Sequence, residues 1–251
     1  MTENNRERLR KSEAAKAKQQ RLNRIIGVGA AVLAVVLIGV FAVVLLQQAG
    51  TASSPTSANP PNATSDAKAI VVNPGKAKDG APVVELFFDY QCPICKQFET
   101  LYSEPLNVLA EAGDIELHYR TMTFLDNNLS NDASTRAGIA AACSDFAGVY
   151  SAFHNEIFAN QPATEGDGYT DEVLRETVPA SVGITAEALT NFQKCYDDQA
   201  TKAFVRGTND KASQDNVTGT PTFHVNGKDV PLSSFSGVDP TELGDLIKQN
   251  A

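Results

Sequence analysis

Cysteine and histidine are scarce in this chain of 251 residues, which contains four cysteines and three histidines. Only one CxxC pair occurs, Cys92 and Cys95, and the other two cysteines, Cys143 and Cys195, lie far apart in the sequence. A four-cysteine zinc site is usually built from two such pairs, and the histidines show no ligand spacing. We therefore expect no metal centre, and we interpret the histidines as ordinary strand or helix residues.

Basic side chains are also scarce in most of the chain. After Leu46 the sequence holds 13 basic and 27 acidic residues, whereas residues 1–24 hold eight basic and three acidic ones. An acidic body argues against nucleic acid as a partner. The acidic segment at 163–172 lacks the ligand order of an EF-hand, so we expect a solvated loop there and no calcium site.

Between the basic head and the acidic body lie 22 uncharged, apolar residues, 25–46. A helix of this length spans about 33 Å, which matches the hydrocarbon core of a bilayer, and it exceeds the apolar region of a cleaved signal peptide, which is the alternative. The sequence predicts a single-pass membrane anchor with residues 1–24 in the cytoplasm and the body outside. Residues 47–80 are poor in large apolar side chains and are predicted to be a flexible linker.

An extracytoplasmic location is oxidising, so four cysteines suggest two disulfides. This location also disfavours a metal clip, so the pair at 92 and 95 could be a structural crosslink or a redox site. Its local setting discriminates between them. An apolar run over 82–90 predicts a buried strand, the apolar period after Cys92 predicts a helix as far as Gly113, and 114–124 predicts a second strand. Strand, helix and strand indicate a βαβ unit with parallel strands.

The rest of the chain is mostly helical until the last forty residues. Apolar residues recur with a helical period from Asn131 to about Ser213. Asn226-Gly227 then predicts a β-hairpin, and Asp239-Pro240 predicts the start of a short final helix. Within the first helix, Pro105 is expected to kink or divide the structure.

Two motifs, FDYQCPICKQFE at 88–99 and GTPTFHVNGK at 219–228, together with this order of elements, resemble the thioredoxin fold with a helical insertion. More narrowly, the chain resembles the DsbA-like family of exported thiol–disulfide oxidoreductases over residues 81–251. The resemblance implies an α/β thioredoxin-like domain with an inserted helical domain at about 126–213, preceded by the anchor and the linker.

The chemistry of the CxxC pair agrees with this resemblance. A helix N-terminus offers unpaired N–H groups and the positive end of the helix dipole, both of which favour a thiolate. Cys92, at the entrance, is predicted to exchange with substrate, and Cys95, one turn inside, to be its shielded partner. The intervening residues Pro93 and Ile94 are expected to tune the pair. Some relatives carry an ionisable histidine there, which this chain lacks.

Three further residues follow from the resemblance. Thr220-Pro221 is expected to form a cis peptide opposite the CxxC and to bind substrate through backbone groups. Relatives often place a buried acid six residues before the first cysteine, where this chain has Leu86. Asp89 is predicted to replace that acid as a proton relay.

Cys143 and Cys195 occupy apolar positions on predicted helices of an exported domain. A second, structural disulfide is predicted, and two separately buried free thiols remain the alternative.

The function implied is a membrane-anchored oxidase that introduces disulfides into exported proteins. It needs no cofactor of its own, and the resemblance implies reoxidation by a DsbB-like or VKOR-like quinone-linked membrane protein. A reductase or isomerase on the same fold and a non-catalytic binding module are the alternatives.

Overall fold

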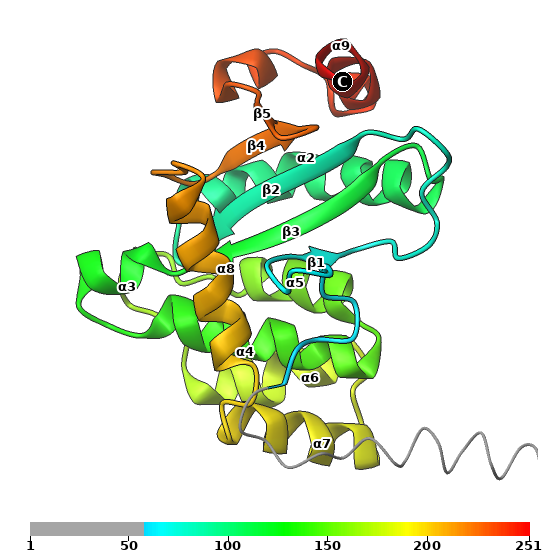
Figure 1. Ribbon diagram of the computed structural model, residues 1–251. Coiled ribbons are helices and arrows are strands. Elements are labelled where there is room, and N and C mark those ends of the chain that lie inside the picture. Colours follow the sequence, from blue (N-terminus) through cyan, green and yellow to red (C-terminus); the bar gives the residue numbers. More distant parts are fainter. Residues whose placement is uncertain (1–57) are drawn as a thin grey trace, which may run out of the picture. The chain divides into compact units, whose positions relative to one another are not determined.

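The computed structural model describes residues 58–251 (Figure 1). Within these residues, five strands form one sheet in the order β1-β3-β2-β4-β5. The strands are β1 (Ile70–Val71), β2 (Val83–Asp89), β3 (Glu116–Met122), β4 (Thr222–Val225) and β5 (Lys228–Asp229). The α-helices are α2 (Pro93–Glu111), α3 (Phe124–Leu129), α4 (Ala133–Ser144), α5 (Tyr150–Ala159), α6 (Val178–Ser181), α7 (Ala186–Asp197), α8 (Lys202–Gln214) and α9 (Leu243–Asn250).

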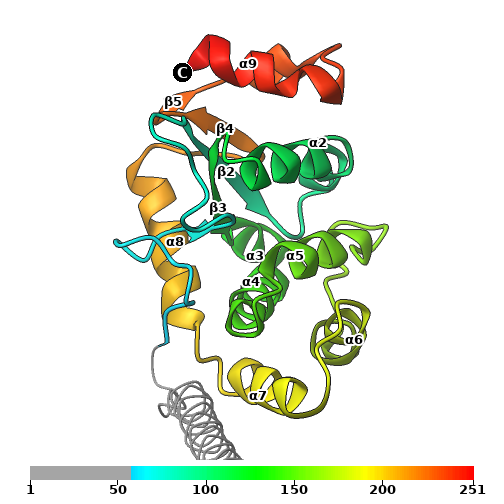
Figure 2. The same ribbon diagram turned by 90° about the vertical axis from the view of Figure 1, so that its right-hand side faces the viewer.

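The predicted βαβ unit forms the centre of the sheet. Strands β2 and β3 are parallel, with Phe87 opposite Arg120, and α2 connects them. Figure 2 shows α2 and α8 on opposite faces of these strands. Phe88 belongs to the main core, whereas Phe87 packs on the other face with Met122 and Ala212 of α8. The strand is therefore buried on both faces, which explains why its sequence is nearly continuous in apolar residues.

The helices α3 to α8 lie between β3 and β4 in the chain, where the helical insertion was expected. Strand β4 then returns antiparallel to β2, with Phe87 opposite Thr222. This pairing places the segment before β4 beside the carboxyl end of β2, although 130 residues separate them in the sequence. The positions of β2 and β4 determine which residues face the CxxC pair.

Residues 58–80 correct the prediction of a linker over 47–80, because this part of it is folded. Strand β1 pairs antiparallel with β3. The Asn73 side chain is buried, donates to the carbonyls of Ala110 and Ile115 at 2.8 and 2.9 Å, and accepts from the N–H of Leu117 at 3.0 Å. The segment is held by these hydrogen bonds and by the burial of Ile70 in the main core, and its overall composition reveals neither. The folded domain therefore begins before residue 81.

The sequence made local predictions for α2, for the hairpin after β4 and for the start of the final helix. Helix α2 continues through Pro105 and is not divided there. The hairpin at Asn226-Gly227 is confirmed, with both residues at positive φ, 50° and 75°. Asp239 caps the 3-10 turn Pro240–Glu242, where its side chain accepts from the N–H of Thr241 at 2.9 Å, and α9 itself begins only after this turn, at Leu243.

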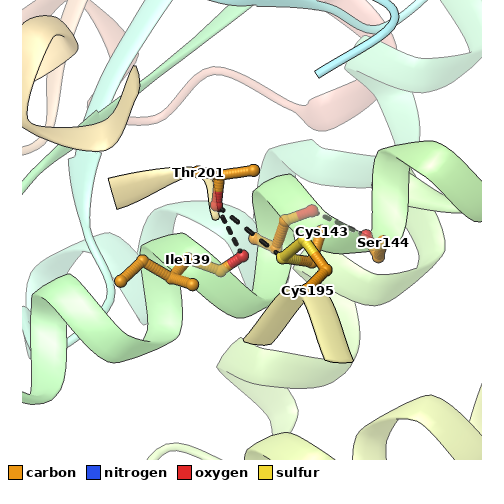
Figure 3. Close-up of a disulfide and its surroundings, with 6 residues drawn as sticks. Ile139, Cys143, Ser144, Cys195 and Thr201 are labelled. Atoms are coloured by element: carbon orange, nitrogen blue, oxygen red, sulfur yellow. Dashed lines mark hydrogen bonds between the residues drawn. A yellow bond between two sulfur atoms is a disulfide. The ribbon is translucent and has the colours of Figure 1, made fainter. Parts of the chain in front are cut away.

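The disulfide between Cys143 and Cys195 is present and joins α4 to α7 (Figure 3). The two Cα atoms are 5.9 Å apart, and 52 positions separate the residues in the sequence. The hydroxyl of Thr201 lies 3.7 Å from the Cys143 sulfur and donates to the carbonyl of Ile139 at 3.2 Å. Of the two alternatives for these cysteines, the structure has the disulfide.

None of the helices in residues 58–251 combines the length and the apolar character that a membrane crossing requires. The predicted anchor, 25–46, and the predicted cytoplasmic tail, 1–24, lie outside the described residues.

Candidate active site

The CxxC pair begins α2 directly after the central strand. Cys92 is the N-cap residue, with φ −76° and ψ 119°, and its N–H donates to the carbonyl of Asp89 at 3.0 Å. Pro93 occupies the first helical position, where its missing N–H is no loss because that N–H has no partner within the helix. The carbonyl of Cys92 accepts from the N–H of Lys96 at 3.2 Å. This geometry leaves the first free N–H groups of the helix close to the Cys92 sulfur.

The two sulfurs have different surroundings, as the sequence predicts. Both are free thiols; Cys92 retains 7% of its surface and Cys95 only 1%. Pro93 and Ile94 are exposed, with Ile94 at 52%. Cys92 is thus the less buried of the two and lies beside the exposed dipeptide, whereas Cys95 faces the core.

The electrostatics of the two thiols also differ. Hydrogen bonding from the Cys95 side chain, supported by the backbone of Cys95 and by Thr220, lowers the pKa of Cys92 from 9.0 to about 6 against the opposing effect of burial. Burial, together with the neighbouring Cys92, raises the pKa of Cys95 well above its ordinary value. At neutral pH Cys92 is thus a thiolate that its protonated neighbour stabilises.

The Thr220-Pro221 bond is cis and lies opposite Cys92, as the resemblance implies. The Cys92 sulfur lies 3.5 Å from the carbonyl oxygen of Thr220, to which it donates only when protonated. The buried Thr220 side chain contributes to lowering the pKa of Cys92 and so favours its thiolate form. The part that this segment plays in substrate binding stays a prediction.

Asp89 is fully buried at the end of β2. Its carboxylate accepts from the Gln91 N–H at 2.9 Å, from the Ser134 hydroxyl at 2.5 Å and from the Leu125 N–H at 3.2 Å. Burial raises the pKa of Asp89 to about 7, although these three donors act in the opposite direction. Because two of the donors belong to the helical insertion, Asp89 connects the active-site loop to α3 and α4. Its action as a proton relay stays a prediction.

Two residues of the insertion hold the active-site loop and were missed in the sequence. The Gln161 side-chain amide donates to the carbonyls of Tyr90 and Cys92 at 2.8 and 3.0 Å. The Tyr169 hydroxyl donates to the carbonyl of Tyr90 at 2.7 Å. Both residues lie in a loop about 70 residues after the CxxC pair and belong to no short motif, so no local signal indicated them.

Residues 163–170 form a loop, as expected, whereas Asp171 and Glu172 begin the next helical segment. Of the histidines, His118 and His224 lie in strands, as expected of ordinary residues. His154 is fully buried in α5, 3.1 Å from the Glu99 carboxylate and 3.0 Å from the Tyr90 hydroxyl. Within residues 58–251, no group of three or more His, Cys, Asp and Glu side chains is arranged to hold a metal ion.

Comparison with known proteins assigns the chain to a family. Residues 75–248 match the family model described as thioredoxin. The chain belongs to the thioredoxin family.

Individual members of the thioredoxin family are similar over most of the chain. The disulfide bond formation protein D of Bacillus subtilis is 26% identical over 192 residues, which cover 75% of this chain and 81% of that protein. Among solved structures, MdbA of Actinomyces oris, a thiol-disulfide oxidoreductase, has a TM-score of 0.65 at 24% identity and covers 76% of this chain and 92% of that one. DsbA of Mycobacterium tuberculosis has a TM-score of 0.58 at 24% identity, and the match covers 73% of this chain and 92% of that one. These two structures share the fold.

For this member of the thioredoxin family, the pKa of Cys92 predicts the pH profile of alkylation. After mild reduction, the rate of reaction with iodoacetamide should rise with a midpoint near pH 6, because the thiolate is the nucleophile and the pKa of Cys92 is about 6. Peptide mapping should place the label on Cys92 and leave the buried Cys95 unmodified in the native protein. A midpoint near the ordinary thiol value of about 8.5 would contradict this assignment.

The raised pKa of Asp89 predicts a pH-dependent stability. The pKa of Asp89 is 3.8 when unperturbed and about 7 in the folded chain, so the folded state binds the extra proton between these values. This contribution is complete below about pH 4 and is lost as the pH rises through 7. It amounts to about 4 kcal/mol at most. Asp89→Asn should remove this pH dependence of the free energy of unfolding. The variant should therefore lose less stability than the wild type between pH 5 and pH 8.

Urea unfolding at a series of pH values measures how the free energy of unfolding changes with pH in the wild type and in Asp89→Asn. Asp114→Asn is the matched control, because Asp114 is exposed and Lys78 lowers its pKa, so it stays ionised in both states above pH 5. The control should keep the wild-type slope. Equal slopes for the wild type and Asp89→Asn would show that Asp89 does not titrate in this range.

Proposed function

We propose that this protein is a membrane-anchored, extracytoplasmic thiol–disulfide oxidoreductase that introduces disulfide bonds into exported proteins. The observation that carries the proposal is the contrast between the two sulfurs at the start of α2. Cys92 is the less buried, at 7% against 1%, and has a pKa of about 6, whereas the pKa of Cys95 is raised. The names of the relatives, disulfide bond formation protein D and thiol-disulfide oxidoreductase, agree with this reaction.

The reaction begins from the oxidised protein, in which Cys92 and Cys95 are joined. A substrate thiolate attacks the Cys92 sulfur, the Cys92–Cys95 bond breaks, and Cys95 leaves as a thiolate and takes up a proton. A second substrate thiolate attacks the substrate sulfur of the mixed disulfide, and Cys92 leaves as a thiolate. The substrate has lost two electrons, and the protein has gained them as a dithiol.

The low pKa of Cys92 favours this direction. A thiolate of low pKa is a good leaving group in the second step, and its stabilisation lowers the free energy of the reduced protein. Thr220 offers its carbonyl next to the reacting sulfur, where the backbone of a bound substrate lies in this proposal. Asp89 is proposed to exchange the proton of Cys95, because it is buried near the pair and its pKa of about 7 suits both directions.

The remaining parts of the proposal rest on the sequence. Residues 25–46 anchor the protein in the cell membrane, with residues 1–24 in the cytoplasm and the thioredoxin domain outside. The substrates are exported proteins with reduced cysteines. Each turnover leaves a dithiol that must be reoxidised, and the acceptor is proposed to be a quinone-linked membrane protein of the DsbB-like or VKOR-like kind.

A disulfide reductase or isomerase is the second candidate. The observation in its favour is Ile94, an exposed apolar residue without a proton-bearing group between the cysteines. A purely binding role is disfavoured, because the thiol pair is free, less buried at Cys92 and polarised.

The reduction potential of the Cys92–Cys95 pair tests the proposal. Equilibration of the full chain with glutathione buffers, followed by alkylation and mass analysis, should give a value well above that of thioredoxin, which is about −270 mV, and towards that of a strong oxidant, about −120 mV. The Cys143–Cys195 bond should stay closed in the same samples. A value near −270 mV would favour the reductase.

A further inference from the structure

Asp89 is the buried acid of the proposed reaction, and its carboxyl is bound by two kinds of group. The backbone N–H groups of Gln91 and Leu125 donate to it at 2.9 and 3.2 Å, and the Ser134 hydroxyl donates to it at 2.5 Å. A backbone N–H can only donate, whereas a hydroxyl can donate or accept by turning about its C–O bond. Among the described residues that hydrogen-bond this carboxyl, Ser134 is therefore the one partner that fits both its ionised and its protonated form.

The Ser134 hydroxyl is held in position from several sides. Ser134 lies in the first turn of α4 and is fully buried. Its N–H donates to the Asp126 carboxylate at 2.8 Å, and its hydroxyl oxygen accepts from the side-chain amide of Gln91 at 2.9 Å. A hydroxyl oxygen has two lone pairs, so one is left to accept from a protonated Asp89. The oxygen is thus fixed beside the acid, while its own proton is able to rotate.

The proposed exchange requires Asp89 to change its protonation state in every turnover. Asp89 gives a proton to Cys95 when that sulfur leaves the disulfide, and it takes the proton back when the disulfide forms again. A carboxyl bound only by N–H donors has no acceptor for the proton that it must hold. We propose that Ser134 is a positioning residue for this exchange, because its hydroxyl donates to the ionised acid and accepts from the protonated acid. This inference rests on the proposed function.

The electrostatics of Asp89 support this part for Ser134. Burial raises the pKa of Asp89 to about 7, and the hydrogen bond from Ser134 acts in the opposite direction. Facing Asp89 are the titratable side chains of Asp126 in α3, of Cys95 in α2 and of Tyr169. A hydrogen bond to an ionised acceptor is stronger than one between neutral groups, so loss of the hydroxyl should raise the pKa of Asp89 further. The acid would then stay protonated at neutral pH and would be a poor acceptor for the proton of Cys95.

The first test is the titration of Asp89 in the full chain. Aspartate is labelled with carbon-13 at its carboxyl carbon, and the Asp89 signal is identified by its loss in Asp89→Asn. Its midpoint should lie near pH 7 in the wild type and about one pH unit higher in Ser134→Ala, because the lost bond favours the ionised form roughly tenfold. Alanine suits a helix, and this change removes only the hydroxyl oxygen, so the variant should fold.

Two further variants are matched controls for this titration. Ser134→Thr keeps a hydroxyl at the same position and should keep the midpoint near pH 7. Ser144→Ala removes the hydroxyl of the other fully buried serine of α4, which donates to the carbonyl of Ala141 at 2.7 Å (Figure 3). Its midpoint should equal that of the wild type. An unshifted midpoint in Ser134→Ala, or an equal shift in Ser144→Ala, would overturn the inference.

The second test follows the proton when oxidised glutathione closes the CxxC pair. The Cys92 thiolate attacks the glutathione disulfide, a mixed disulfide forms, and one glutathione thiolate leaves. Asp89 takes the proton of Cys95, whose thiolate then attacks the Cys92 sulfur and expels the second glutathione thiolate. Two electrons pass from the protein to glutathione, and Asp89 releases the proton to the solvent.

At saturating oxidised glutathione, the second of these attacks limits the rate of closure. Ser134→Ala should close about fivefold more slowly than the wild type at pH 7, since the ionised fraction of Asp89 falls from about half to about a tenth. The rate should recover about one pH unit higher. Ser134→Thr and Ser144→Ala should close at the wild-type rate.

The two tests distinguish failure of this inference from failure of the proposed function. Equal closure rates despite a shifted Asp89 midpoint would show that Asp89 does not exchange the proton of Cys95, and would overturn the part assigned to Ser134. The carbon-13 titration and the closure by glutathione need no protein substrate. A chain that passes both tests but oxidises no dithiol peptide would therefore count against the proposed function and not against Ser134.

Discussion

Replacing Cys92 by alanine should abolish oxidation of a reduced dithiol substrate, with a loss on the order of 10⁴-fold or more, as is typical when a nucleophile is removed. The reason is structural: Cys92 is the less buried of the two, while Cys95 is 1% exposed and faces the core. The measurement is the rate at which the pre-oxidised full chain, or the variant, converts a dithiol peptide to its disulfide.

Cys95→Ala is the matched variant and should behave differently. It cannot close the internal disulfide, so a mixed disulfide between Cys92 and substrate should accumulate and be visible on a non-reducing gel. Trapping of substrate by Cys92→Ala, through Cys95, would reverse the assignment of the two sulfurs.

Removing the second disulfide should affect stability rather than chemistry. The bond between Cys143 and Cys195 closes a loop of 52 positions, and such a closure lowers the entropy of the unfolded chain by an amount worth about 4 kcal/mol. For a domain of this size, the Cys143→Ala/Cys195→Ala variant should melt about 8–16 °C lower. Calorimetry of the oxidised proteins measures the difference.

The control for this measurement is the Cys92→Ala/Cys95→Ala variant, which keeps the Cys143–Cys195 bond. Its melting temperature should lie much closer to that of wild type in which only the Cys92–Cys95 pair is reduced, because that reduced pair closes no loop. Alkylation of Cys92 in the folded Cys143→Ala/Cys195→Ala variant should keep its midpoint near pH 6, since α4 and α7 carry the bond and neither holds the CxxC pair. An unchanged melting temperature would leave the bond without a stabilising role.

The sequence by itself determined the features that depend on neighbouring residues. The buried strand before Cys92 follows from a continuous apolar run, and the helix after it from a 3.6-residue period and Pro93 at its first position. The hairpin follows from Asn226-Gly227, which can adopt the positive φ values that the turn requires. The contrast between Cys92 and Cys95 also follows from local order, because one precedes the helix and the other lies a turn inside it.

Resemblance to a family supplied what those local patterns could not. The cis bond at Thr220-Pro221 and its position opposite Cys92 depend on the pairing of β4 with β2. No property of residues 220 and 221 alone predicts that pairing, because it joins segments about 130 residues apart.

Only the tertiary structure decided the rest. Whether Cys143 and Cys195 bond depends on the distance between α4 and α7, and the sequence left both outcomes open. The order of residues 58–80 depends on long-range contacts, namely the hydrogen bonds of Asn73 and the burial of Ile70 in the main core. Gln161 and Tyr169 hold the carbonyls of the active-site loop from about 70 residues away. Long-range hydrogen bonds leave no periodic signal in a sequence, so they become visible only when the folded chain brings their partners together.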